Sequence, residues 1–201
     1  MKVTELDNIT GTLSKPSKMP GWAYGIPAKE CKTGSKLAKI PGTVCHGCYA
    51  LKGCYVFPNV QEAQYKRLAA IDHPLWVQAM AAQILRHKSK YFRWHDSGDI
   101  QSLEHLKKIF EVCKLTPDVN HWLPTREASI IACITPEEVP ANLIIRISAT
   151  KVDGNPPTFW PYTSSVVTEN KTCPAAEQDN KCLSCRACWD RNVKNVAYGK
   201  H

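Results

Sequence analysis

The sequence contains no long hydrophobic run. Its longest apolar stretches, Ser129 to Ile134 and Leu143 to Ile147, are far shorter than the roughly 20 residues that a membrane-spanning helix needs. The first stretch, Met1 to Gly11, is polar and lacks the apolar segment of an export signal. We therefore expect a cytoplasmic protein without a membrane partner.

The sequence also lacks internal repeats and low-complexity segments, which argues against a repeat architecture and against extended disordered tails. At 201 residues, with 43% hydrophobic and 22% charged residues, the chain is long enough for one hydrophobic core and has the composition of an ordinary globular domain. We expect a single domain.

Cysteine, in contrast, is abundant and clustered. Eight of the ten cysteines form two groups, Cys31, Cys45, Cys48 and Cys54 near one end and Cys173, Cys182, Cys185 and Cys188 near the other. The two-residue gaps of the second group let successive sulfurs converge on one centre. Cys113 lies on an apolar helix face and Cys133 in an apolar run, so both are expected in the core.

Three interpretations of the two groups compete. Disulfides need an oxidising compartment, for which the sequence shows no export signal, so they are the weakest. Structural zinc usually uses two separated Cys-x2-Cys pairs, whereas the C-terminal group is a triple run typical of bacterial ferredoxin clusters. Spacing alone therefore favours [4Fe-4S] clusters, one or two, with zinc as the alternative metal.

The expected organisation follows from these groups. We expect an N-terminal cluster-binding loop region at residues 1–58, an α/β core at 59–168 and a C-terminal cluster-binding segment at 169–201. The stretch 15–58 is rich in Gly, Pro and Lys and has little periodicity, which predicts an ordered loop around a ligand. Metal-bound thiolates offset part of the formal charge of +8, so electrostatics favour an anionic partner only weakly.

The periodicity of the core predicts alternating helices and strands. Helices are expected at 60–71, 74–88 and 100–114, and strands at 91–95, 121–124, 143–149 and 165–168, with a short connection at 128–134. This alternation is typical of parallel sheets with right-handed crossovers. We expect an α/β fold, either a partial (β/α) barrel or an open, mostly parallel sheet, with long cysteine-bearing loops at both ends.

Polar residues follow each predicted strand, where ligands bind in parallel α/β folds. The candidate catalytic residues are His95, Asp96, Asp99, Arg126 and Glu127, and the candidate cofactor-binding residues are Ser97, Gly98, Asp99, Arg126 and Ser148. A guanidinium binds carboxylate or phosphate with two parallel hydrogen bonds, and carboxylates accept hydrogen bonds from amines or hydroxyls. The alternative is structural: Ser97 or Asp99 caps the helix near Gln101, and Arg126 pairs with Glu127.

Several motifs resemble the phage family called gene product eighty-eight. They are Ser17 to Gly21, Cys45 to Gly53, Phe92 to Asp99, Leu123 to Glu127 and Tyr198 to His201, and the resemblance runs over nearly the whole chain. It implies a phage-encoded protein in the host cytoplasm, and no settled activity.

A more distant resemblance connects Cys45-x2-Cys48-Tyr49-Ala50 and the Ser97-Gly98-Asp99 turn with radical S-adenosylmethionine enzymes of the photoproduct-lyase-like kind. It implies three cysteines on a [4Fe-4S] cluster, with Cys31 or Cys54 beside the closing pair. The fourth iron would bind S-adenosylmethionine, and the turn would hold its amino group.

The sequence is therefore compatible with three classes of function. The first is an iron-sulfur protein, either a radical S-adenosylmethionine-like enzyme with a small-molecule or nucleic-acid substrate or a redox protein with an electron donor. The second is a zinc-stabilised, non-catalytic protein that binds nucleic acid through its basic N-terminal segment, with Trp22, Tyr24 and Tyr49. The third is a small electron-transfer protein with two clusters. His201 is a further, weaker candidate for a cluster or cavity contact.

Overall fold

Six strands form one open sheet in which every strand is parallel to its neighbours. The computed structural model describes residues 1–200. The strand order follows the chain from β1 to β6, so β1 and β6 are the free edges and the sheet is not closed into a barrel. The predicted α/β class is confirmed, in its open-sheet form.

The strands and helices have these bounds. The strands are β1 (Trp22–Tyr24), β2 (Tyr91–Trp94), β3 (Asn120–Thr125), β4 (Leu143–Ser148), β5 (Thr163–Val167) and β6 (Asn195–Gly199). The α-helices are α1 (Val3–Thr10), α2 (Lys32–Leu37), α3 (Pro58–Ala70), α4 (Trp76–Arg86), α5 (Leu103–Leu115) and α6 (Ala128–Ile131). The 3-10 helices include η1 (Ala28–Glu30), η2 (Tyr49–Leu51), η3 (Gly53–Val56) and η6 (Ala187–Trp189).

The elements at the two ends of the chain were not predicted. The stretch 15–58 contains β1 and α2 in addition to irregular backbone, and β6 lies in the C-terminal cysteine-bearing segment. A three-residue strand between Gly21 and Gly25, and a strand that ends on Gly199, have too few alternating residues to give a periodic signal. Both therefore become recognisable only through pairing with neighbouring strands.

The start of α5 corrects a prediction. The helix begins at Leu103, and its cap is Ser102, whose Oγ accepts a hydrogen bond from the backbone N–H of His105 at 3.1 Å. Neither Ser97 nor Asp99 caps it, because an extended connection separates them from the first helical turn. Asp99 accepts instead from the backbone N–H of Ile100 at 2.8 Å.

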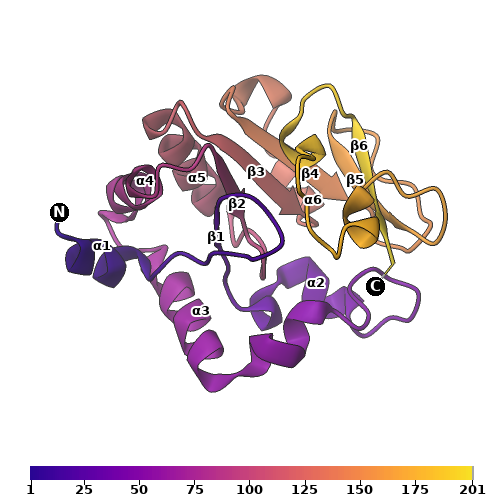
Figure 1. The fold of residues 1–201 in the computed structure, drawn as a ribbon, viewed down its shortest axis with the longest axis horizontal. Coiled ribbons are helices and arrows are strands. Elements are labelled where there is room, and N and C mark those ends of the chain that lie inside the picture. Colours follow the sequence, from indigo (N-terminus) through magenta and orange to yellow (C-terminus); the bar gives the residue numbers. More distant parts are fainter. Residues whose placement is uncertain (201) are drawn as a thin grey trace.

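One face of the sheet is covered by helices. Right-handed crossovers between strands in sequential order place the connecting helices on the same side, and Figure 1 shows α4 and α5 there. Phe92, Trp94 and Ile145 from the sheet pack against Met80 of α4 and Leu106 of α5 in one buried core. Within the described part of the chain, no helix has the length and apolar character to cross a membrane.

The other face is covered by the C-terminal segment, which passes over β4 and β5 in Figure 1. The Trp189 ring lies 5.4 Å from the Tyr91 ring and 5.2 Å from the Trp122 ring, and its indole N–H donates to the Phe92 carbonyl at 3.1 Å. This face also carries Arg146, which is fully buried. The sheet thus has an apolar side and a polar side.

Candidate functional site

Three N-terminal cysteines come together in the connection that follows β1. Cys31 lies between η1 and α2, and Cys48 directly precedes η2. A methyl group placed at Gly34 would be 3.6 Å from the Sγ atoms of both Cys31 and Cys45. Gly34 therefore lies close to both sulfurs, and a Cβ there would also approach the Cβ of Cys31 to 3.0 Å.

The electrostatics of these thiols confirm their proximity. Burial raises the pKa of Cys31 well above that of a free thiol, and the charges of Asp99, Cys48 and Cys45 raise it further. Burial also raises the pKa of Cys45, whereas the positive charge of the Arg126 guanidinium lowers it. Such thiols stay protonated unless a cation replaces the proton, so ligand binding at this group would release protons.

The loop that carries the cysteines is fixed across the carboxyl ends of the strands. Both carboxylate oxygens of Glu127 accept from Thr33, from its N–H at 2.8 Å and its hydroxyl at 2.7 Å. The backbone N–H of Val44 donates to the Thr150 carbonyl, beyond β4, at 2.9 Å. The segment between β1 and Cys45 is therefore attached to the connections that follow β3 and β4.

Cys54 lies apart from this group. It is exposed on η3. The charges of Cys45 and Cys48 raise the pKa of Cys31, and that of Cys48 raises the pKa of Cys45, whereas Cys54 is not among the causes of either shift. The structure thus groups three N-terminal thiols and separates the fourth. Cys113 lies in the core as predicted, but Cys133 is exposed, so its assignment to the core is wrong. All ten cysteines carry free thiols.

The turn after β2 packs closely on the segment after β1. Gly98 has a positive φ of 79°, and a Cβ there would approach the Ile26 side chain to 2.3 Å and its carbonyl oxygen to 2.7 Å. The Ser97 carbonyl accepts from the Ile26 N–H at 2.9 Å. Gly98 therefore has a packing role that the sequence did not reveal.

Asp99 connects the turn after β2 to the end of β3. Its Oδ1 accepts from the Thr125 hydroxyl at 2.6 Å, and its Oδ2 accepts from the backbone N–H of Arg126 at 2.8 Å. Burial raises the pKa of Asp99 to about 6, although these hydrogen bonds oppose the shift. Asp99 and Glu127 thus both accept hydrogen bonds from a backbone N–H and from a threonine hydroxyl, and these bonds orient the candidate site.

Three neighbouring residues of the same turn carry buried polar atoms without a hydrogen-bond partner in the described part of the chain. They are Oδ1 of Asp96, Oγ of Ser97 and both ring nitrogens of His95. The His95 ring packs against the His105 ring of α5, with centroids 5.3 Å apart. A polar ligand at this turn would supply the partners that Asp96 and Ser97 lack.

Arg126 and Ser148 have different surroundings. Arg126 makes no ion pair with Glu127 in residues 1–200, its Nε is buried without a partner, and its charge acts on the Cys45 thiol. The Ser148 hydroxyl is 2.8 Å from the Ser164 hydroxyl of β5. Arg126 is therefore free to bind an anion beside the three thiols, whereas Ser148 bonds within the sheet.

The four C-terminal cysteines line one pocket between the C-terminal segment and the sheet. Cys173, Cys182, Cys185 and Cys188 all contribute to it, together with Trp189 and Val196. Burial raises the pKa of Cys188 to about 11, and its Sγ lies 3.1 Å from the Tyr198 hydroxyl. The second group predicted from the sequence is therefore assembled as a set of four.

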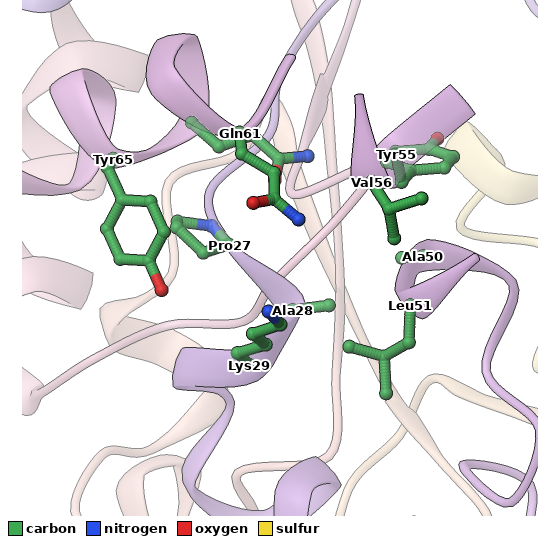
Figure 2. A pocket seen from close by; sticks show the side chains of 10 residues that line it. Pro27, Ala28, Lys29, Ala50, Leu51, Tyr55, Val56, Gln61 and Tyr65 are labelled. Carbon is green, nitrogen blue, oxygen red and sulfur yellow. The ribbon is translucent and has the colours of Figure 1, made fainter. Parts of the chain in front are cut away.

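A further pocket lies beside the N-terminal loop and contains no cysteine. Figure 2 shows Tyr65 and Gln61 of α3 near Pro27 and Ala28, with Leu51 on the opposite side. None of the predicted catalytic, cofactor-binding or metal-binding residues lines it. His201 lies outside the described residues.

Neither thiol group is arranged around a single ion. Across residues 1–200 no set of three or more His, Cys, Asp or Glu side chains is placed to hold one metal ion. In a tetrahedral zinc site with Zn–S bonds of about 2.3 Å, neighbouring sulfurs are roughly 3.8 Å apart. A [4Fe-4S] cluster places its own iron and sulfide between the thiolates, so its ligand sulfurs lie farther apart than those around a single zinc ion.

Three buried histidines make the fold sensitive to acid. Burial lowers the pKa of His95 and of His121 to about 3 and that of His105 well below its usual value. Because these folded-state pKa values are depressed, the unfolded chain binds more protons below pH about 6.5, and stability falls as the pH falls. Asp99 and Asp96, whose pKa values are raised by burial, oppose this effect.

We expect the free energy of unfolding to fall by about 2 kcal/mol per pH unit between pH 6 and 5, since each net proton contributes about 1.4 kcal/mol per unit. Urea unfolding at a series of pH values measures this slope. His105→Gln removes one of the protons that the unfolded chain takes up, so it is expected to reduce the slope by roughly 1.4 kcal/mol per pH unit. A slope that is flat in the wild type would contradict neutral buried imidazoles.

Sequence reasoning missed Arg93, Arg146 and Tyr198. The alternation Phe92-Arg93-Trp94 places Arg93 on the face of β2 opposite its apolar neighbours, a signal that strand periodicity contains. Arg146 interrupts an apolar strand in the same way. Both arginines were charged residues inside predicted strands, and both lie on the polar side of the sheet. Tyr198 lies on β6, which was not predicted.

The comparisons with known proteins give one match. A family model described as Gene product 88 matches residues 2–160, which includes the three grouped N-terminal cysteines and the strand-end residues but not the C-terminal cysteines. Neither the curated proteins nor the solved structures include a significant match.

Proposed function

The chain belongs to the Gene product 88 family, and we propose that it is an iron-sulfur protein that binds a [4Fe-4S] cluster at each of its two cysteine groups. The observation that carries the proposal is the division of the cysteines into a set of three and a set of four. Thiolates grouped at this spacing are ligands for soft metals, and free thiols in all ten positions leave them available.

The set of three supports a cluster with one open iron. Cys31, Cys45 and Cys48 supply three ligands, and Cys54 is exposed and separate. The open position would face the carboxyl ends of β2 and β3, where Arg126 and the Ser97 hydroxyl lack protein partners. We propose this as the site for S-adenosylmethionine, with Arg126 on the carboxylate and the turn after β2 on the amino group.

The sheet topology supports the same proposal. The resemblance to radical S-adenosylmethionine enzymes implies a parallel sheet after the cysteines, with the Ser-Gly-Asp turn at the end of its first strand. In this chain β2 is the first strand after the cysteines, it is parallel to its neighbours, and the Ser-Gly-Asp turn follows it. When bound, the cluster would supply the electron for chemistry. The residues of this chain would bind and orient the cofactor and substrate, and the reducing cytoplasm would keep the thiols available.

Cysteine variants test the set of three. In anaerobically purified protein, Cys48→Ser is expected to lose about half of the bound iron and acid-labile sulfide, because one of two clusters loses a ligand. Cys54→Ser, six residues along the same loop, is the matched control and is expected to retain the wild-type iron content. Equal iron loss in both variants would show four ligands and a closed cluster, which suits electron transfer instead.

Spectroscopy tests the open iron. Addition of S-adenosylmethionine to the reduced protein is expected to change the electron paramagnetic resonance signal of the N-terminal cluster, and Cys48→Ser is expected to abolish the change. A signal that is identical with and without S-adenosylmethionine would refute cofactor binding. Zinc in place of iron in oxygen-protected protein would refute the iron-sulfur proposal at both sites.

A specific observation also favours nucleic-acid binding as a second candidate. The side chains of Lys15, Lys18, Lys29, Lys32, Lys36 and Lys39 are all exposed, and none forms an ion pair in the described chain. Lys32 and Lys36 are one helical turn apart on α2 and share a face. Binding to duplex DNA that weakens steeply with salt, and is reduced by Lys32→Gln with Lys36→Gln, would support this candidate.

A further inference from the structure

Arg93 lies on the polar side of β2, beneath the C-terminal segment. Its neighbours Phe92 and Trp94 point into the helix-covered core, so alternation along the strand directs Arg93 to the opposite face. Its guanidinium carbon is 4.7 Å from the centre of the Trp122 ring. The indole ring packs against one face of the guanidinium, and this contact uses none of its hydrogen-bond donors.

The donors of Arg93 are only partly used. Its Nη1 contacts the sulfur of Met19 at 3.8 Å, the Tyr49 side chain is a further hydrogen-bond partner, and its Nε is buried without a partner. No ion pair in residues 1–200 includes it. A guanidinium has five N–H donors, and a partly buried one such as that of Arg93 is costly to keep with few acceptors.

Arg146 of β4 lies on the same face of the sheet as Arg93 and is an example of a structural arginine in this fold. Its guanidinium donates to the carbonyl oxygens of Cys188, Thr163, Lys194, Ala187, Asp190 and Val193 at 2.8 to 3.3 Å. Every nitrogen of that side chain therefore has a protein acceptor. Arg93 has the same chemistry but is only partly buried, and its hydrogen-bond partners within residues 1–200 are the Met19 sulfur and the Tyr49 side chain.

The position of Arg93 connects the two cysteine groups. Met19, whose sulfur contacts Nη1 of Arg93, directly follows Lys18, and the Lys18 carbonyl accepts from the backbone N–H of Cys182 at 2.8 Å. Burial alone would lower the pKa of Arg93, but Tyr49, Asp96 and Tyr198 together raise it. Tyr49 directly follows Cys48 of the N-terminal group, and its hydroxyl donates to the Asp96 carbonyl at 2.7 Å. Arg93 therefore remains a cation between the two groups.

We propose that Arg93 binds an oxyanion, a carboxylate or phosphate group of a small-molecule substrate. The unpartnered Oδ1 of Asp96 would accept a hydrogen bond from a hydroxyl or amine of the same molecule. The expected ligand is therefore a molecule that carries an anionic group and, next to it, a hydroxyl or amine that can donate a hydrogen bond. The inference rests on the proposed function for the roles of the two groups, but the anion site depends only on Arg93 and its neighbours.

Calorimetric titration at constant ionic strength tests the site, with inorganic phosphate and acetate as separate probes. At least one probe is expected to bind the wild type with 1:1 stoichiometry, and which of them binds more tightly distinguishes phosphate from carboxylate. Arg93→Met is expected to weaken binding at least tenfold. Arg86→Met, which removes an exposed arginine from α4, is the control and is expected to change affinity less than twofold.

Equal loss in both arginine variants, or no binding of either probe by the wild type, would overturn the proposal. Thermal unfolding separates ligand binding from folding: Arg93→Met is expected to shift the wild-type midpoint by less than about 4 °C in probe-free buffer. A fall as large as that of Arg146→Met would make Arg93 structural and would also overturn the proposal. Iron content, measured on the same samples, reports separately on the proposed function.

Discussion

Replacement of Arg146 by Met is expected to lower the free energy of unfolding by about 4 kcal/mol, because it leaves buried carbonyl oxygens without donors. Five of the six acceptors belong to the segment from Ala187 to Lys194, which includes Cys188 and follows the other three C-terminal cysteines. We therefore expect the variant also to lose the metal that we propose for the C-terminal group. Urea unfolding and metal analysis of the purified protein measure the two effects.

Arg191→Met is the matched control for this variant. Arg191 also donates only to carbonyl oxygens, those of Pro140, Ala141 and Leu143, at 2.9 to 3.2 Å, but it is exposed. Water can replace its donors, so we expect a loss below about 1 kcal/mol and unchanged metal content. Similar losses in the two variants would contradict the role assigned to the buried guanidinium.

The core of the fold was predictable because its strands and helices are long enough to show their periods. The strands near positions 91, 121 and 143, and the helices between them, appear within a few residues of their predicted bounds. β1 and β6 were not predictable, because each is short. β1 is flanked by glycines and β6 ends on one, and each is recognisable as a strand only because it pairs with a neighbour, β2 and β5 respectively. Short edge strands depend on tertiary pairing more than on local sequence.

The candidate site was predictable in its location and less so in its details. Polar residues after β2 and β3 do meet the cysteine-bearing loop, as the rule for parallel sheets predicts. Spacing alone did not exclude Cys54, and only the folded loop separates it from Cys31. The roles of Glu127 as the partner of Thr33 and of Asp99 as the link to β3 depend on contacts between residues far apart in the sequence.

Gly98→Ala is expected to have the second largest effect, a loss of at least about 3 kcal/mol in the free energy of unfolding. A positive φ of 79° costs an L-residue roughly 1 to 2 kcal/mol. The new Cβ would also overlap the Ile26 side chain at 2.3 Å and its carbonyl oxygen at 2.7 Å. The turn after β2 would have to move away from the end of β1, which would displace Asp96 and Ser97 from the candidate site.

Gly42→Ala separates the two contributions to this loss. Gly42 has nearly the same φ, 81°, but a Cβ there meets no atom within 4 Å. We expect this control to lose only about 1 kcal/mol, from backbone strain alone. Urea unfolding of the two variants measures the difference, which reports the contact between Gly98 and Ile26. If Gly98→Ala lost no more than Gly42→Ala, the close packing between the ends of β1 and β2 would be refuted, and with it the rigid turn on which the proposed cofactor site depends.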